Sequence, residues 1–315
     1  MYTIKETAAR TSVPVSLLRA WERRYGIVAP LRTPAGYRLY DDAAIDRLRT
    51  MRRLVDDGWS PSIAAAAIVH GEVPPEPTET ALPAERGDQR PGAQEGDGVR
   101  RELIVQFVDG AIGLDASTIE AALDRMFAAG SFEVVADALL LPALGAIGEA
   151  WADGRLGVAG EHAASHAMLR RLSAAYQAAG TQGPSGGGIL VGLPPAARHE
   201  LAALAFSVAA RRAGLTVLYL GPDLPADDWV ATAVRTGARA AVVAAPTLGD
   251  VGPAAAVGRA LRSALPDLTI AFGGRGAARA REALGSAGGV ATLPDGMAAA
   301  VDALREVLAN APAPT

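Results

Sequence analysis

Apolar residues recur along this chain with three different rhythms, which divide it into three parts. In the first part they mark short amphipathic segments, at about 5–11, 15–25, 42–57 and 60–69. In the middle part they follow helical spacing over longer segments, near 101–113, 117–128, 131–150 and 159–179. After the glycine-rich break at 184–188, short apolar runs alternate with alanine-rich helical segments. The change of rhythm predicts three folding units rather than one.

Each rhythm favours its own architecture. Short connections between the middle helices make a four-helix bundle the simplest packing. The apolar runs of the last part are Ile189–Leu193, Thr216–Leu220, Ala240–Ala245 and Leu268–Phe272. Buried strands that alternate with helices predict a Rossmann-like, doubly wound parallel sheet. We therefore expect a multidomain protein of α and α/β class.

Residues 75–99 are rich in proline, glycine and acidic side chains and almost free of large apolar ones. Such a segment cannot bury enough apolar surface to fold alone, so we interpret it as a flexible linker. The predicted units are then residues 1–74, the linker 75–99, the bundle 100–182 and the Rossmann-like domain 183–315.

Composition narrows the class of protein. The chain has no cysteine, which excludes disulfides and thiolate metal sites. No apolar run reaches about 18 residues and no export signal is seen at the N-terminus, so we expect a cytoplasmic protein. The net charge of −4 is uneven: residues 1–70 carry eleven Lys or Arg against seven Asp or Glu, and the acidic excess lies beyond them. Only the N-terminal part suits a polyanion.

The N-terminal segments have the layout of a helix-turn-helix. Two short helices flank a tight turn at 12–14, with Leu17, Leu18 and Trp21 on the core side of the second helix. The side chains expected to face outward from this helix are Ser16, Arg19, Arg23 and Arg24. Since Arg19 and Arg23 lie one turn apart, both can reach bases or phosphates in one major groove of double-stranded DNA.

A proline- and glycine-containing stretch follows, in which Ala35-Gly36 can form the turn of a small β-wing. Its candidate DNA contacts are Arg32, Tyr37 and Arg38. Residues 2–69 with this arrangement resemble the MerR family of transcriptional regulators. The resemblance implies dimeric binding to an inverted-repeat operator. MerR regulators usually dimerise through a long helix in place of the linker, so we expect the C-terminal half to form the homo-oligomer, a dimer or tetramer.

The strongest candidate for ligand chemistry is a two-part signature. Trp151 is followed after nine residues by Glu161-His162, and 37 residues later by His199. His199 comes six residues after the first strand, and parallel sheets bind ligands at the carboxyl ends of their strands. Neutral imidazole is a good ligand for cobalt. The aromatic plane and two polar tips of the bundle residues suit the opposite face of a large metal-centred ring.

The same residues are similar to those of cobalamin-binding, light-responsive repressors of the CarH type, which join a MerR reader, a helical cap and a Rossmann-like domain. The similarity covers essentially the whole chain. Its motifs are Ile147–Trp151, the Trp-x9-Glu-His spacing, Pro194-Pro195 with Arg198–Glu200, Leu218–Asp223 and Phe272–Gly276. The resemblance implies that His199 is the lower axial ligand of cobalt, with adenosylcobalamin as the cofactor. It implies further that Trp151, Glu161 and His162 cap the adenosyl group and that Gly273 and Gly274 line the cleft for the nucleotide tail.

The chain departs from the family pattern at several positions. Ala197 and Ala202 replace an acidic residue two before the histidine and a glycine three after it, and Ala245 replaces a hydroxyl near the ligand tail. Loss of a carboxylate that orients a ligating imidazole typically costs 10–100-fold in affinity. Ala152 stands where the best-studied light sensors have a histidine that binds cobalt after illumination. His166, one turn after His162, is a conceivable substitute.

These departures leave alternatives open. The pocket could be empty, or it could bind another ligand such as a tetrapyrrole. The bundle and Rossmann-like units also occur in cobalamin-dependent methyltransferases and mutases, but residues 2–69 form a DNA reader and no catalytic barrel is found. We therefore expect a transcriptional regulator, a repressor rather than an enzyme.

Overall fold

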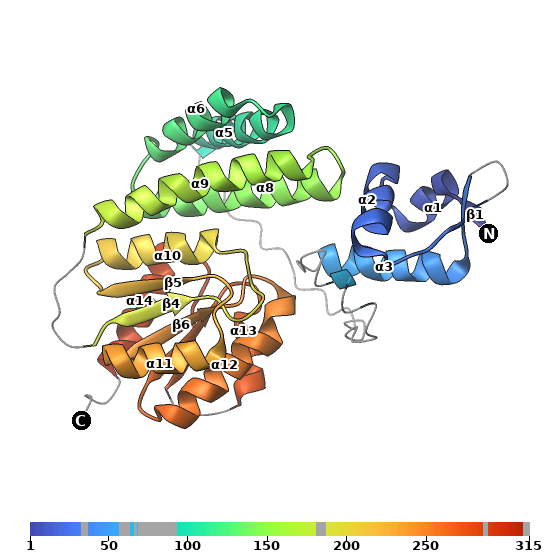
Figure 1. The fold of residues 1–315 in the computed structure, drawn as a ribbon. Helices are drawn as coiled ribbons and strands as arrows, with labels where there is room; N and C mark the ends of the chain where they lie inside the picture. Colours follow the sequence, from blue (N-terminus) through green and yellow to red (C-terminus); the bar gives the residue numbers. More distant parts are fainter. Residues whose placement is uncertain are drawn as a thin grey trace. The chain divides into compact units, whose positions relative to one another are not determined.

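The computed structural model describes residues 1–32, 37–56, 64, 65, 68, 93–180, 187–285 and 289–310. Contacts divide the chain into two compact units, of which the first joins Met1–Ala122 with Gly145–Glu161 and the second joins Leu123–Leu144 with His162–Thr315. The boundary passes through helices of the middle part, coloured green in Figure 1, so that part contributes to both units.

The N-terminal part combines helices with a small antiparallel sheet, drawn in blue in Figure 1. Its elements are β1 (Tyr2–Thr3), α1 (Ile4–Thr11), α2 (Val15–Tyr25), β2 (Leu31–Arg32), β3 (Arg38–Tyr40) and α3 (Asp42–Asp56). The strand order is β1-β3-β2. A capping box starts α1, because the Thr3 hydroxyl accepts from the Glu6 amide at 3.4 Å while the Glu6 carboxylate accepts from the Thr3 amide at 2.7 Å.

This arrangement is the predicted helix-turn-helix with two wing strands. The apolar face of α2 and the inner face of α3 share one hydrophobic cluster, in which Leu18, Trp21, Tyr40, Leu48 and Met51 are buried. The predicted wing turn at Ala35-Gly36 and most of the predicted helix at 60–69 lie outside the described residues.

The middle part is helical, as its apolar spacing predicts. Its elements are α5 (Ala93–Gly113), α6 (Ala116–Phe127), α7 (Phe132–Val135), the π-helix η1 (Ala136–Leu140), α8 (Leu141–Ala152) and α9 (Val158–Ala178). The first helix begins at Ala93, inside the segment interpreted as a linker, and the rest of 75–92 lies outside the described residues.

A π-helical turn interrupts the long apolar helix between α7 and α8. The Leu141 amide donates to the Ala136 carbonyl five residues earlier, immediately before Pro142. Proline has no amide hydrogen to continue the ladder, so a locally widened turn is a ready way to accommodate it. The turn places the Asp137 carboxylate at the start of α14, where both its oxygens accept from the Met297 amide at 2.9 Å.

Residues Phe132–Ala152, taken as one helical stretch, are long and apolar enough to span a membrane by composition alone. A single helix of this kind is weak evidence for a span, because core helices pass the same test.

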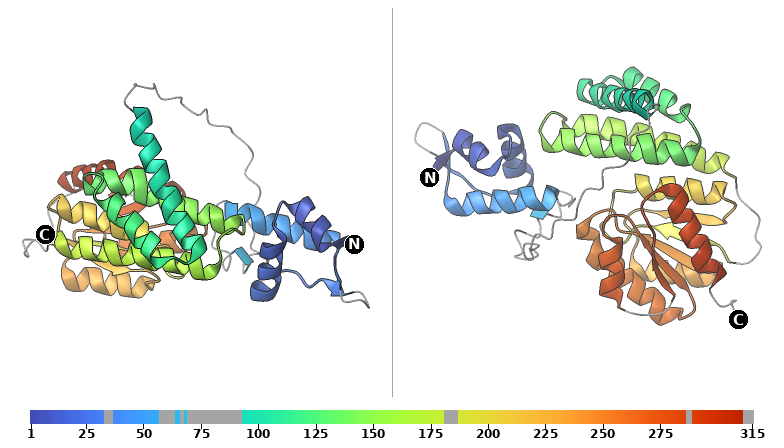
Figure 2. Two further views of the ribbon diagram at one scale, coloured as in Figure 1. Left: turned by 90° about the horizontal axis from the view of Figure 1, so that it is seen from above. Right: turned by 180° about the vertical axis from the view of Figure 1, so that it is seen from behind.

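The last part is a five-stranded parallel sheet with helices on both faces (Figure 1; Figure 2, right), which confirms the Rossmann-like prediction. The strands are β4 (Ile189–Gly192), β5 (Val217–Gly221), β6 (Ala240–Ala244), β7 (Thr269–Gly273) and β8 (Val290–Thr292). The helical elements are α10 (Leu201–Arg212), α11 (Ala226–Thr236), η2 (Leu248–Asp250), α12 (Val251–Ala264), α13 (Ala277–Leu284) and α14 (Met297–Ala309). The strand order is β5-β4-β6-β7-β8.

The two faces of the sheet are covered by different helices. One face packs against α11, α12 and α13 through a cluster that contains Trp229, Val257, Leu261 and Phe272. The other is covered by α10 and α14, which contact each other. Residues 203–210 of α10 are buried without a break, so this helix is covered on its outer side as well.

That outer cover includes α9, which lies beyond α10 in Figure 1. Tyr176 of α9 reaches the open edge of β5, where its hydroxyl accepts from the Tyr219 amide and donates to the Val217 carbonyl, both at 3.0 Å. Arg211 stacks on the Tyr176 ring at 3.5 Å and also donates to the Val217 carbonyl. These contacts satisfy backbone groups that an edge strand would otherwise expose, and they fix the end of α9 on the sheet.

The contact between Asp137 and the start of α14 should contribute measurably to the stability of the fold. We expect Asp137→Ala to lower the free energy of unfolding by about 1–2 kcal/mol, because a charge-assisted bond to a helix N-terminus is lost. Urea denaturation followed by circular dichroism measures this. Asp302→Ala, on the exposed side of α14, is the matched control and should change stability by less than about 0.5 kcal/mol. Equal effects of the two substitutions would contradict the role of Asp137.

Candidate functional site

The second helix of the N-terminal part presents one polar face. Leu17, Leu18 and Trp21 are buried, as predicted, and Arg19 is exposed on the other side. The side chains of Ser16, Arg23, Arg24 and Arg32 lie outside what the structure describes, so their predicted contacts with DNA remain predictions. The exposed guanidinium of Arg19 is suited to a phosphate or a base edge.

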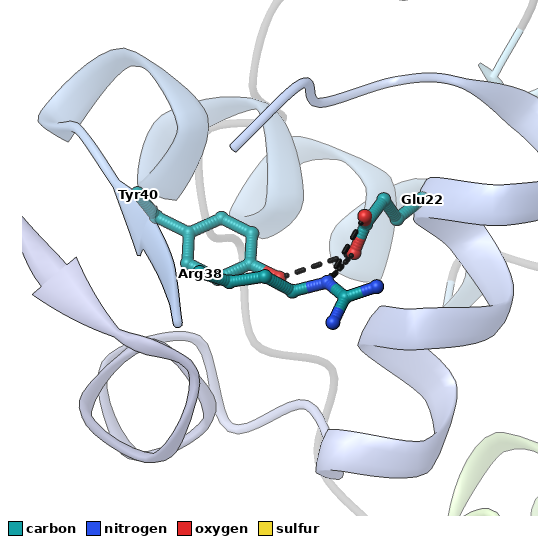
Figure 3. A network of polar contacts seen from close by, with 3 residues as sticks. All are labelled: Glu22, Arg38 and Tyr40. Carbon is teal, nitrogen blue, oxygen red and sulfur yellow. Dashed lines mark hydrogen bonds and ion pairs between the residues drawn. The ribbon is translucent and has the colours of Figure 1, made fainter. Parts of the chain in front are cut away.

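A polar network joins this helix to the wing (Figure 3). The Arg38 Nε donates to both carboxylate oxygens of Glu22, at 2.8 and 3.0 Å, and the Tyr40 hydroxyl donates to the same carboxylate at 3.3 Å. Burial, together with the neighbouring Glu22 charge, raises the pKa of Tyr40 to about 12. The network therefore locks strand β3 onto α2 with a buried tyrosine and an ion pair.

The sequence prediction gave Arg38 a direct DNA contact and overlooked Glu22. In the structure the Arg38 Nε donates to Glu22 and the side chain is partly exposed, so Arg38 holds the wing, and its predicted contact with DNA stays a prediction. Tyr37, by contrast, is 72% exposed at the start of the wing strand, where a partner can reach it. Glu22 could have been noticed as the single acid within a run of arginines.

The predicted cap residues lie on α8 and α9. Trp151 is half-buried near the end of α8, and Ala152 follows as its last residue. Glu161 lies half-buried in the first turn of α9, while His162 is exposed. Gly160 precedes them where α9 meets α5: a Cβ there would lie 2.3 Å from the Ala111 carbonyl oxygen, so only glycine permits this approach.

His162 shares a helical stripe with the residue that anchors α9. His162, Leu169 and Tyr176 are seven residues apart, and such positions lie on nearly the same face of a helix. Of these residues Tyr176 contacts the edge of β5, Leu169 is half-buried and His162 is exposed. In Figure 1 α9 runs opposite in direction to β4.

His166 extends the polar end of α9. Its Nδ1 lies 2.8 Å from the His162 carbonyl oxygen, which as a hydrogen bond would place the proton on Nδ1 and leave Nε2 as an acceptor. The two imidazole rings meet edge to face, with centroids 6.1 Å apart.

His199 lies in the loop between β4 and α10, at the topological switch point of the sheet. The first strand of the sheet, β4, pairs with β5 on one side and β6 on the other, so the connections that leave these strands diverge. The His199 side chain is exposed, and within the described residues no hydrogen bond or ion pair engages it. An imidazole in this position has the donor chemistry that cobalt accepts.

The loop around His199 is held from the neighbouring strand. The Asp223 carboxylate accepts from the Ala196 amide at 2.7 Å, and the Asp223 amide donates to the Ala197 carbonyl at 3.0 Å. On the other side the Tyr219 hydroxyl donates to the Glu200 carboxylate at 2.8 Å. Burial and the Glu200 contact raise the pKa of Tyr219. The sequence prediction quoted this stretch as a motif without assigning it a role.

The predicted tail-cleft residues lie at the same edge of the sheet. Gly273 ends β7, and Gly274 has φ +92°, a conformation that favours glycine. A Cβ at Gly274 would lie 2.7 Å from the Ala245 carbonyl oxygen. The two strand-end loops therefore pack backbone to backbone, which explains the glycine in terms of the fold itself.

The family departures have distinct surroundings. Ala197 and Ala245 are fully buried, so the missing carboxylate and hydroxyl would have been interior groups, whereas Ala202 is half-buried. Two residues after Ala245, the buried Thr247 hydroxyl donates to Asp250 at 2.8 Å. Polar groups in this loop are thus engaged with each other.

Comparison with known families matches two of the three predicted folded units. Residues 2–67 match the family described as MerR HTH family regulatory protein, and residues 103–176 match the family described as B12 binding domain. The predicted MerR-type reader is thereby confirmed, and the family match to a B12 binding domain falls on the predicted helical bundle and supports a link to cobalamin.

Relatives also match over most of the chain. The HTH-type transcriptional repressor CarH of Myxococcus xanthus is 35% identical over 72% of this chain and 73% of its own. The HTH-type transcriptional repressor CarA of the same organism is 32% identical over 90% of both chains. A monomethylamine corrinoid protein of Methanosarcina barkeri shares the fold, with a TM-score of 0.50 and 15% identity over 66% of this chain and 99% of that one. Since the relatives by sequence are repressors, the prediction of a regulator rather than an enzyme subunit is confirmed.

Loss of Arg19 should weaken DNA binding through a charge on the exposed face of α2. We expect Arg19→Ala to reduce affinity for a duplex selected by the wild-type chain from a random pool. If Arg19 contacts a phosphate, the slope of log K against log salt should fall by about one. Fluorescence anisotropy over a salt series measures both quantities. Arg235→Ala, which removes an exposed arginine from α11, is the control, and an Arg19 variant that behaves like it would contradict the groove-reading role.

Proposed function

Since this chain belongs to the CarH and CarA family of transcriptional repressors, we propose that it is a repressor whose assembly on DNA is set by bound cobalamin. The observation that carries the proposal is the exposed, unengaged His199 at the switch point of a sheet whose neighbouring region matches a B12-binding family. The MerR-type region of the same chain supplies the DNA binding that the ligand would control. Such a protein acts in the cytoplasm, with the DNA that it binds.

The residues present fit a corrin at this edge. His199 would supply the lower axial imidazole, and Gly273 and Gly274 would lie beside the nucleotide tail. The family resemblance assigns Trp151, Glu161 and His162 to the cap over an adenosyl group. Adenosylcobalamin supplies a cobalt–carbon bond that light can cleave. The fit rests on the donor chemistry of His199, whose side chain is exposed at the switch point of the sheet.

Control of DNA binding would act through association. Bound cobalamin would fix the surface through which C-terminal halves of neighbouring copies join as a dimer or tetramer. Joined copies present several DNA readers at once, which raises avidity through effective concentration without a new base contact. Illumination would change the cap and release the readers from one another. The affinity of one reader for one half-site would then hardly change.

A second candidate is favoured by the buried Ala197 and Ala245. With both polar partners missing, the pocket could serve another ligand such as a tetrapyrrole, or none. The absorption spectrum of the purified chain separates these possibilities, because corrins and linear tetrapyrroles absorb at different wavelengths.

His199→Ala tests the axial assignment. We expect affinity for adenosylcobalamin in the dark to fall at least about tenfold, because the ligating imidazole is lost. We also expect the visible spectrum of any residual complex to lose the features of histidine ligation. Equilibrium dialysis and absorption spectroscopy measure these effects, with His166→Ala as the control that keeps the lower ligand. A His199 variant with an unchanged spectrum would rule out the assignment.

Ala152→His tests the departure at the end of α8. An imidazole there should slow the loss of cobalamin after illumination by about tenfold or more, since 1.4 kcal/mol of added ligation already gives that factor. Gel filtration of illuminated protein, with cobalt measured in the protein peak, follows the retention. Retention equal to wild type would show that position 152 does not govern the illuminated state.

A further inference from the structure

The loop that carries His199 is held by hydrogen bonds on both sides of the histidine. Their partners lie in β5 or shortly after it. Asp223 follows β5 and holds the backbone of Ala196 and Ala197, just before the histidine. Tyr219 lies within β5 and holds the carboxylate of Glu200, just after it. Arg198 and His199 lie between these two sets of contacts, and the His199 side chain stays exposed.

The residues of the first set of contacts have a strained backbone conformation. Ala196 has φ +66° and Asp223 has φ +57°, values that residues other than glycine adopt rarely and at a cost of about 1 kcal/mol or more each. These two residues are bonded to each other, because the Ala196 amide donates to the Asp223 carboxylate at 2.7 Å. Strain of this kind persists where the surroundings determine it, and it gathers at functional loops. The contact therefore fixes the path of the loop in a way that neither residue would adopt alone.

The second set of contacts is anchored on α9. The Tyr219 backbone amide donates to the Tyr176 hydroxyl, and the two rings meet edge to face with centroids 6.2 Å apart. Its own hydroxyl has the Glu200 carboxylate as a partner at 2.8 Å, and Glu200 immediately precedes α10. Tyr219 thus connects Glu200, at the end of the loop that carries His199, to α9.

Both sets of contacts lie beside a position where a group that would orient the His199 imidazole is missing. A carboxylate that bonds to a ligating imidazole normally fixes the ring, and Ala197 leaves no such group on the loop. Hydrogen bonds that hold the backbone on either side of His199 can also orient its imidazole, because a restrained Cα limits the directions open to the ring.

Building on the proposed function, we propose that Asp223 and Tyr219 are positioning residues for His199, and that they hold it ready for cobalt in place of a carboxylate at position 197. Neither residue contacts the metal in this arrangement. Their effect reaches the ligand through the backbone of Ala196 and Ala197 and through Glu200.

The test compares full-length Asp223→Ala, Asp223→Asn and Tyr219→Phe with wild type, each loaded in the dark with adenosylcobalamin. We expect Asp223→Ala and Tyr219→Phe to lose about 10–100-fold in affinity, with a smaller fraction of the bound cobalamin showing histidine ligation in its visible spectrum. Asp223→Asn should keep most of the ligation, because an amide oxygen can still accept from the Ala196 amide. Asp228→Ala removes a nearby exposed carboxylate from α11 and should bind like wild type.

A second measurement uses the protein without ligand. Hydrogen–deuterium exchange should be faster across residues 194–201 in Asp223→Ala than in wild type, with unchanged exchange in β6 and β7. That pattern separates local loosening from general loss of folding.

The outcomes distinguish the two proposals. If wild type binds cobalamin and His199→Ala weakens it, while Asp223→Ala and Tyr219→Phe retain full affinity and histidine ligation, the positioning role is overturned and the proposed function stands. If wild type retains no cobalamin, both are overturned, even where exchange shows that Asp223 holds the loop.

Discussion

The pairing of β4 with β5 on one side and β6 on the other is the constraint on which the C-terminal part of the molecule depends. Four consecutive residues of β4 are buried, so the strand must lie in the middle of the sheet with helices on both faces. In a doubly wound sheet the first strand then marks the switch point, where the loops that follow neighbouring strands diverge. His199, the histidine loop and the Asp223 turn all lie at this one place.

Specific polar contacts join α9 and the η1 segment to the sheet and its helices. Tyr176 and Arg211 satisfy the open edge of β5, and Asp137 is placed at the start of α14 by a π-helical turn that precedes Pro142. Tyr219 belongs to both systems, since its amide contacts Tyr176 and its hydroxyl contacts Glu200. Hydrogen bonds of Tyr219 therefore connect the histidine loop to α9, the helix that also carries His162.

Sequence periodicity was sufficient for the architecture but not for the contacts around the sites. The four apolar runs each became a strand, whereas β8 escaped prediction because Val290–Thr292 is short and only partly buried. The outward face of α2 followed from the burial of Leu17, Leu18 and Trp21. The Glu22–Arg38 and Asp223–Ala196 contacts did not follow, because they join segments 16 and 27 residues apart whose register only the folded chain sets. The assignment of Arg38 to DNA stays a prediction, beside its contact with Glu22.

The most direct test of cobalamin-controlled assembly is the mass of the purified chain after dark loading with adenosylcobalamin, measured by light scattering during gel filtration before and after illumination. We expect cobalt to elute with the protein at about one per chain, at a dimer or tetramer mass that falls once the sample is illuminated. A chain that elutes without cobalt, or whose mass is the same with and without cobalamin and light, would contradict the proposed control of assembly.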